Sequence, residues 1–292
     1  MGLTYRFRRD LLEGARWCFL AARAVLSRRV IPLPHGYATV TLTTHRARHW
    51  AAMLAVDSLA RGALRPARVV LFLDGRSYSR EHLPFPLAVL ARRGVDVVCL
   101  DEDYGSYTKL PVFAWSPEPQ QMPVITMDDD VLYPSDWLLR FRDSAALGGN
   151  EILCYHARAI TLDDAGAFAP YLQWELVRHT EARYGLLPLG VYGVLYTRDA
   201  LEAIRRKGLE FRIAPNVDDL WFRLCTIERG IKARRVVSDV VRFPPAPFTE
   251  RAAIYPGNVF GGGNDRKIAL IAPLFDLSVL RNECGAAGRS ER

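Results

Sequence analysis

Cysteine is scarce in this sequence and is not spaced for a structural role. The 292 residues include five cysteines, at positions 18, 99, 154, 225 and 284, and no Cys-x-x-Cys pair. This spacing disfavours zinc ribbons and disulfide frameworks. Most of the cysteines stand in apolar runs such as VDVVCL, so we interpret them as small buried hydrophobes in a reducing compartment.

The N-terminal segment lacks an apolar run long enough to cross a membrane. Charged residues interrupt it well short of the roughly 20 residues that a span needs, and no small-residue cleavage site follows a clean apolar stretch, which disfavours a signal peptide. Apolar residues instead recur at helical spacing from Leu11 to Leu26, with seven arginines at other positions. We expect residues 1–34 to hold a basic amphipathic helix, which either lies on an anionic membrane or packs on the core.

The chain also lacks an internal repeat or a long low-complexity linker. Half of its residues are hydrophobic and about a quarter are charged, which is typical of a globular chain. We therefore expect a single domain over residues 35–275, with a first half at 35–150 and a second at 151–275. We expect residues 276–292 to form a flexible tail.

Charge of the two signs is unequal, and the net charge is +7. A basic balance suggests an anionic partner, which could be nucleotide phosphates, nucleic acid or an anionic membrane face. No recognised nucleic-acid-binding motif is present, so we expect no nucleic-acid partner.

Short apolar runs alternate with helical segments after Pro32 and Pro34. The runs are YATVTLTT, ARVVLFL, VDVVCL and MPVITM, and helical patterns separate the first three. This alternation predicts an α/β fold, with a Rossmann-like, mostly parallel central sheet and helices on both faces.

Polar residues follow each of these four runs. They are Thr43, Thr44, His45 and Arg46, then Asp74, then Asp101 and Asp103, and finally Asp128, Asp129 and Asp130. Ligands bind beyond the carboxyl ends of strands in open α/β sheets. The coincidence across four strands therefore predicts a binding site at this edge.

The three consecutive aspartates need compensation because clustered carboxylates repel one another. Water does this at a surface, in a solvated cap before Pro134, and a divalent cation does it in a binding site. On a strand, Asp128 and Asp130 would face the same side, about 6.6 Å apart. At this spacing both could hardly bind one Mg²⁺ without a turn or a bridging water, so the pair suits a cation shared with a diphosphate.

Six segments in order resemble those of bacterial glycosyltransferases of the GT-A fold. They are VTLTTHRAR, SYTKL, VITMDDDVLYP, GVYGVLY, NVDDLWF and GGGNDRKI, within residues 37–270. The chain looks most like the enzymes that build capsular or lipopolysaccharide chains. This resemblance implies a nucleotide-diphosphate sugar donor, a glycan or lipid-linked acceptor, and Mn²⁺ or Mg²⁺ on an Asp-x-Asp motif, here Asp128 and Asp130.

The resemblance also implies roles at the nucleotide. Asp74 matches a residue that contacts the base, although an Asp-Gly turn explains it nearly as well. Arg46 would face phosphates and Lys109 would lie near the nucleotide, unless both are solvated surface residues. The full set of predicted nucleotide-binding residues is Thr43, Thr44, Arg46, Asp74, Lys109, Asp128 and Asp129.

Asp218 and Asp219 form a second acidic pair at an expected helix start. A helix N-terminus stabilises a carboxylate by about 0.3–1 kcal/mol, so capping explains one of the two. The resemblance places the catalytic base here, and we favour Asp219 over Asp218. A base at this point implies an inverting transfer. The resemblance further suggests a cytoplasmic enzyme that acts at the inner face of the plasma membrane.

Two other functions remain open. A nucleotidyltransferase of similar fold would also use clustered aspartates and a metal, but it usually has a glycine-rich loop after the first strand, and TLTTHRAR has no glycine. A non-catalytic protein that binds membrane or nucleic acid would explain the basic charge. It would not explain the three aspartates that close an apolar run.

Overall fold

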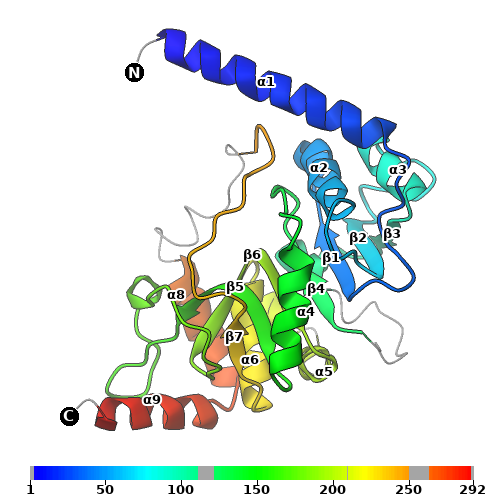
Figure 1. Cartoon of the computed structure of the whole chain (residues 1–292). Coiled ribbons are helices and arrows are strands. Elements are labelled where there is room, and N and C mark those ends of the chain that lie inside the picture. Colours follow the sequence, from blue (N-terminus) through cyan, green and yellow to red (C-terminus); the bar gives the residue numbers. More distant parts are fainter. Residues whose placement is uncertain (1–2, 111–121, 209, 250–262, 291–292) are drawn as a thin grey trace.

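The computed structural model contains one seven-stranded sheet at its centre (Figure 1). It describes residues 3–110, 122–208, 210–249 and 263–290. The strand order is β3-β2-β1-β4-β6-β5-β7. The strands are β1 (Thr39–Thr43), β2 (Arg68–Asp74), β3 (Asp96–Leu100), β4 (Val124–Thr126), β5 (Ile152–Ala159), β6 (Leu186–Tyr196) and β7 (Ala233–Arg235).

Most neighbouring strands are parallel. Strand β1 pairs in parallel with β2 and β4, β2 with β3, and β5 with β7, whereas β6 runs antiparallel to both β4 and β5. The carboxyl ends of β1 to β4 therefore emerge at one edge of the sheet. The single sheet takes strands from both of the expected halves, 35–150 and 151–275.

Alternate strand residues face opposite sides of the sheet, as the two-residue period of a strand requires. Leu153 belongs to the core on one side and its neighbours Ile152 and Cys154 to the core on the other. The first core includes α1 (Leu3–Leu26), α2 (His49–Leu59), α3 (Phe85–Arg92) and α4 (Trp137–Leu147). The second includes α5 (Arg198–Arg206), α6 (Asp218–Glu228), α8 (Gly263–Ile271) and α9 (Ser278–Ser290).

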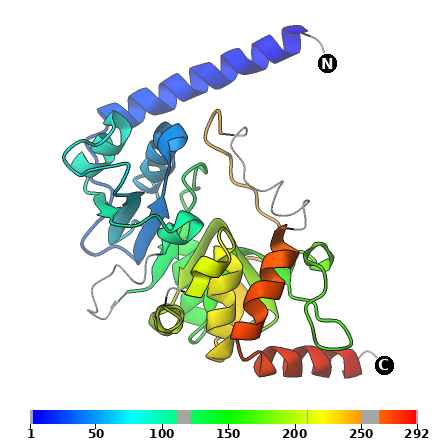
Figure 2. The same ribbon diagram turned by 180° about the vertical axis from the view of Figure 1, so that it is seen from behind.

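The two faces are seen in turn in the two ribbon views. Helix α4 crosses in front of the sheet in Figure 1, and α6 and α8, in yellow and orange-red, lie in front of it in Figure 2. The predicted α/β class, with helices on both faces of a mostly parallel sheet, is confirmed.

The predicted N-terminal helix is present as α1, and its C-terminal half packs on the domain. Leu20, Ala21 and Ala24 are buried, and the Trp17 ring lies 5.2 Å from that of Trp50. No helix in the described ranges is both long enough and apolar enough to cross a bilayer.

The expectation of a flexible tail over residues 276–292 is wrong for most of that segment. Residues Ser278–Ser290 form helix α9. Leu280 is fully buried in the core, and the Glu283 carboxylate accepts hydrogen bonds from the backbone N–H groups of Tyr184 and Gly185 at 3.0 and 2.6 Å. One buried leucine and one charge-assisted hydrogen-bonding group therefore fix a segment that the sequence predicts to be flexible.

Candidate functional site

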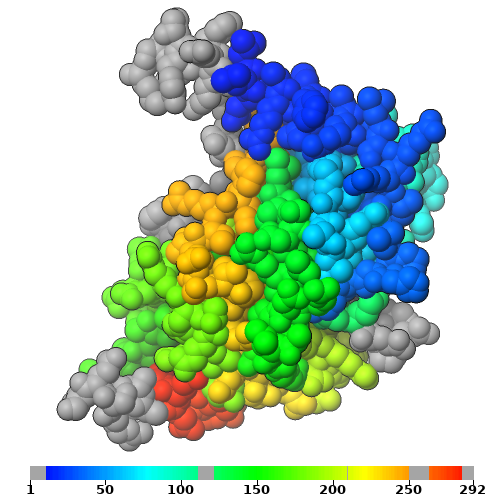
Figure 3. All heavy atoms as spheres, viewed as in Figure 1, coloured from blue at the N-terminus to red at the C-terminus, as the bar shows by residue number. Residues whose placement is uncertain are grey.

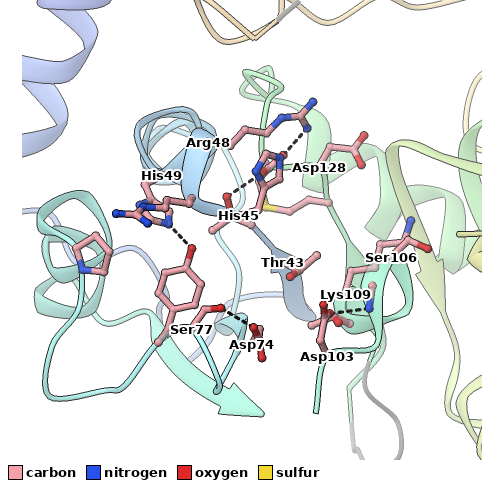
Figure 4. Close-up of a pocket in the computed structure, with 18 of the residues that line it drawn as sticks. Thr43, His45, Arg48, His49, Asp74, Ser77, Asp103, Ser106, Lys109 and Asp128 are labelled. Carbon is pink, nitrogen blue, oxygen red and sulfur yellow. Dashed lines mark hydrogen bonds and ion pairs between the residues drawn. The ribbon is translucent and has the colours of Figure 1, made fainter. Parts of the chain in front are cut away.

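A cavity of about 970 Å³ lies at the carboxyl ends of β1, β2 and β4. Its walls come from segments that are far apart in the sequence, as the labelled side chains in Figure 4 show. The lining residues include Thr43, Thr44, His45, Arg46, Arg48, Asp74, Asp103, Lys109, Asp128 and Asp129. All seven predicted nucleotide-binding residues thus surround one space.

Two of the three consecutive aspartates are compensated by protein groups. Asp129 is buried, and its carboxylate accepts hydrogen bonds from the Thr44 hydroxyl at 2.6 Å and from Arg48 at 3.0 Å. The same Arg48 Nη1 lies 3.0 Å from Asp130 Oδ2. Arg48 therefore offsets the repulsion between these two carboxylates, while Thr44 and Asp129 hold each other in place.

The Asp128 carboxylate has different partners from those of Asp129 and Asp130. One of its oxygens lies 3.4 Å from the backbone N–H of Tyr192, which is a weak contact. Burial raises the pKa of Asp128 to about 7, with Lys109 opposing the shift and Asp130 adding to it. An additional cation beside Asp128 would favour its charged form.

The fit of a metal ion can be judged from the donor groups. In the part of the chain that the structure describes, no three His, Cys, Asp or Glu side chains converge on one point. A resident all-protein metal cage is therefore not formed by these residues. Mg²⁺, however, usually keeps several waters and binds one or two carboxylates together with substrate phosphates. Asp128 lines the cavity, and Asp130, which is paired with Arg48, stands two positions further along the chain, so these two carboxylates are the candidates for that second arrangement.

Lys109 joins the large cavity to the second acidic pair. It comes from the 3₁₀ helix η2 (Gly105–Lys109), and its Nζ lies 2.5 Å from Asp218 Oδ2 and 3.3 Å from Asp219 Oδ1. Burial alone would lower the pKa of Lys109, but Asp218, Asp219 and Asp128 together raise it well above its usual value. One lysine thus faces three carboxylates, so the cluster of four side chains has a net negative charge.

The acidic pair does not cap the helix that it begins. Helix α6 has Val217 at its N-cap position with no side-chain cap. The Asp219 carboxylate accepts a hydrogen bond from the backbone N–H of Gly190 at 2.7 Å and another from Lys109. Burial raises the pKa of Asp219, against the opposing effect of Lys109. Both carboxylates thus stand in the first turn of α6, and no side-chain hydrogen bond caps this helix at Val217.

A second cavity, of about 390 Å³, lies on the other side of the acidic pair. Its wall combines apolar side chains, such as Leu176, Leu189 and Val191, with polar and charged ones, which include His156, Arg158, Asp218 and Asp219. Asn216 lines both cavities. The Asp219 side chain is 30% exposed and that of Asp218 is 10% exposed, so Asp219 is the more accessible carboxylate at this junction.

Two residues from the sequence prediction have structural partners as well as a place in the cavity wall. Asp74 accepts hydrogen bonds from the backbone N–H of Arg76 at 3.0 Å and the Ser77 hydroxyl at 2.7 Å, and these bonds lower its pKa. The expected Asp-Gly turn therefore exists. The Thr43 hydroxyl donates to the Phe72 carbonyl at 3.0 Å and links β1 to β2.

Asn216 and Tyr192 shape the junction through their backbones, a role that the sequence does not predict. Both have positive φ angles, 58° and 69°, which are uncommon for residues other than glycine. The Tyr192 carbonyl accepts a hydrogen bond from the Trp137 indole at 2.7 Å, which holds this part of β6. Backbone strain often clusters at functional sites, but no pattern of side chains in the sequence predicts it.

Gly190 is required at the junction for a steric reason. A Cβ atom at this position would lie 2.7 Å from Lys109 Nζ and 2.9 Å from Asp219 Oδ1. Gly193, the other glycine of the GVYGVLY segment, has a φ of 106° and packs against Trp137. Glycine at 190 therefore makes room for the lysine–aspartate pair.

Comparison with solved structures bears on the fold. A structure of residues 1–349 of TarS from S. aureus superposes with a TM-score of 0.50 over 84% of this chain and 67% of that one, at 14% identity. The fold is GT-A-like. At this identity the likeness concerns the fold alone.

Another solved structure gives a weaker match. It is 4-diphosphocytidyl-2C-methyl-D-erythritol synthase from Anaerococcus prevotii, with a TM-score of 0.45, 11% identity, and coverage of 80% of this chain and 99% of that one. No protein-family model and no curated protein matches the sequence. The function of this GT-A-like chain must therefore be argued from its own residues.

Proposed function

We propose that this protein is a glycosyltransferase that moves a sugar from a nucleotide-diphosphate donor to a hydroxyl group of a glycan or lipid-linked acceptor. One observation carries the proposal. The large cavity at the carboxyl ends of the strands and a smaller second cavity meet at the cluster formed by Lys109, Asp218 and Asp219. A two-substrate transfer needs two sites with reactive groups between them.

The larger cavity suits the donor. Its volume of about 970 Å³ lies at the upper end of the range for small-molecule sites, and its position is the one where open α/β sheets bind nucleotides. Arg46 gives one wall a positive charge for phosphates. Asp74 and the hydroxyls of Thr43 and Thr44 supply groups for the nucleoside.

A divalent cation, Mn²⁺ or Mg²⁺, would be held by Asp128 and Asp130 together with the diphosphate. When bound it would stabilise the negative charge that develops on the departing diphosphate. Thr44 and Arg48 bind the third carboxylate, Asp129. Of the two proposed metal ligands, Asp128 lines the cavity, and Asp130 shares Arg48 with Asp129.

Asp219 is proposed as the general base. It would take the proton from the acceptor hydroxyl while that oxygen bonds to the anomeric carbon and the bond from that carbon to the diphosphate breaks. Attack from the side opposite the leaving group inverts the anomeric centre. A raised pKa and an accessible position between the cavities suit a base. Asp218 instead holds Lys109.

The sequence segments that resemble capsular and lipopolysaccharide enzymes support a role in cell-surface polysaccharide synthesis on the cytoplasmic side of the membrane. The apolar residues in the wall of the second cavity, such as Leu176, Leu189 and Val191, are compatible with an acceptor that carries an apolar portion. The donor sugar is left to be found by experiment.

The first test is a panel of nucleotide-diphosphate sugars with Mn²⁺, scored by thermal shift and by slow hydrolysis of the donor. Calorimetry then compares UDP or GDP binding, with and without Mn²⁺, in wild type and Asp130→Ala. We expect the variant to lose at least about tenfold in metal-dependent affinity, because one carboxylate ligand is gone.

The matched control is Asp136→Ala, which removes an exposed aspartate paired with Arg140 at 2.6 Å and should bind like wild type. Equal metal-dependent affinity in Asp130→Ala would contradict the metal assignment. Release of pyrophosphate from a nucleoside triphosphate, without any hydrolysis of a nucleotide sugar, would instead indicate a nucleotidyltransferase.

A further inference from the structure

Helix α1 has two apolar faces, and only one of them is used in packing within the described chain. The packed face consists of Leu20, Ala21 and Ala24, which are buried, and Trp17, which contacts Trp50. These contacts fix the C-terminal half of the helix on α2.

The second face, here called the outer seam, consists of Leu11, Leu12, Ala15, Phe19, Ala22 and Leu26. All six residues are exposed, and Leu11, Leu12, Phe19 and Leu26 are exposed to 63%, 65%, 65% and 78%. Their spacing of three and four residues places them along one side of the helix. From Leu11 to Leu26 the seam runs about 22 Å at 1.5 Å per residue.

The outer seam lies at the margin of the molecule. Helix α1 runs along the top in both ribbon views, and in the space-filling view no described segment lies above it (Figure 3). Large apolar surfaces left exposed in this way mark interaction sites.

Charge around the seam indicates what covers it. Residues 1–30 contain seven arginines and two acidic residues, a net charge of +5 out of the chain's +7. Arg16 is exposed and lies one turn from both Leu12 and Phe19. The Arg23 guanidinium lies over the Phe19 ring, 5.5 Å from its centroid. The apolar seam is therefore bordered by positive charge.

We propose that the outer seam inserts into the surface of an anionic lipid bilayer, with α1 lying in the membrane plane and its arginines among the headgroups. Apolar side chains beside basic ones are the combination that interfacial helices use. A second copy of the chain fits less well, because two such seams would bring their arginines together. The inference concerns where the protein acts and does not depend on its reaction.

The test is co-sedimentation of the full chain with vesicles of phosphatidylcholine, with and without phosphatidylglycerol. We expect binding only when phosphatidylglycerol is present, and weaker binding as salt rises. The double variant Leu12→Asp/Phe19→Asp should bind at least about tenfold more weakly, because the buried apolar surface is lost. The matched control Leu147→Asp changes a leucine that is 84% exposed at the end of α4 and should bind like wild type.

A charge variant, Arg16→Glu/Arg28→Glu, provides a second arm that leaves the apolar residues in place. Both positions are exposed, so the fold should survive, which circular dichroism will check. Equal binding of wild type to neutral and anionic vesicles would overturn the proposal. Normal vesicle binding by Leu12→Asp/Phe19→Asp would also overturn it. A third contrary result is a wild-type protein that does not bind vesicles but forms a dimer in solution, which Leu12→Asp/Phe19→Asp dissociates.

Discussion

Replacing Asp219 by Asn would separate the chemistry of the acidic pair from its structural role. The change removes one negative charge and keeps the size of the side chain. An amide oxygen can still accept the hydrogen bond from the Gly190 N–H, which is 2.7 Å long in the wild type. Lys109 keeps its shorter contact, 2.5 Å to Asp218.

The expected magnitudes differ between the two aspartates. A positioned general base contributes about 10²–10⁴ in rate, which is roughly 3–5 kcal/mol of barrier, so Asp219→Asn should slow sugar transfer by that factor. Its stability should change little, because the acidic cluster loses one of three like charges. Asp218→Asn removes the nearest partner of a buried lysine, which typically costs about 3–5 kcal/mol of unfolding free energy. Because Asp219 remains 3.3 Å from Lys109, we expect the lower end of that range.

The assay measures the transfer rate, calorimetric affinity for the nucleotide with Mn²⁺, and unfolding by urea for each variant against wild type. Asp219→Asn should show slow transfer with normal affinity and stability, and Asp218→Asn should show reduced stability. Transfer by Asp219→Asn within a few-fold of wild type would refute the assignment of the base. Slow transfer with full stability in Asp218→Asn alone would reverse the two roles.

Two further changes test the packing around the site and beneath α1. Gly190→Ala places a Cβ atom against Lys109. Sugar transfer should fall by at least about tenfold while nucleotide affinity is retained, because a small misplacement at a reacting centre is costly in rate. Unchanged transfer would show that the junction is unimportant. Asp57→Ala leaves the buried Arg93 without the carboxylate that lies 2.8 Å away, so urea unfolding should show a loss of about 3–5 kcal/mol. The control Asp96→Ala breaks an exposed pair with Arg68 and should cost no more than about 1 kcal/mol; equal losses would contradict this reasoning.

The periodicity of the sequence is enough to predict the sheet and the edge at which the large cavity lies. Apolar runs of strand length ending in Asp74 and Asp128 place both residues at one edge of a parallel sheet by geometry alone. Which groups compensate the aspartates could not be predicted. Arg48 and Asp129 are 81 positions apart, and their contact depends on the register between β1 and β4.

The second acidic pair shows the same limit. The sequence places Asp218 and Asp219 at a helix start, but local rules favour capping there. Their actual partners, Lys109 and Gly190, lie on η2 and β6 and become visible only when the chain is folded. Helix α9 differs from expectation because a few long-range contacts outweigh a composition that suggests disorder.

The guanidinium of Arg93 has a mechanical consequence for α1. It donates to the carbonyls of Ala24 and Arg29, at 3.2 and 2.9 Å, and to Asp57 on α2. Arg93 thus fastens the end of α1 to the domain, in addition to the packing of its C-terminal half, while the N-terminal turns extend beyond these contacts. A helix of 24 residues is about 36 Å long, so α1 acts as a stiff lever arm. Any force on its N-terminal end would reach the domain as torque about Arg93, and the helix and domain would turn together.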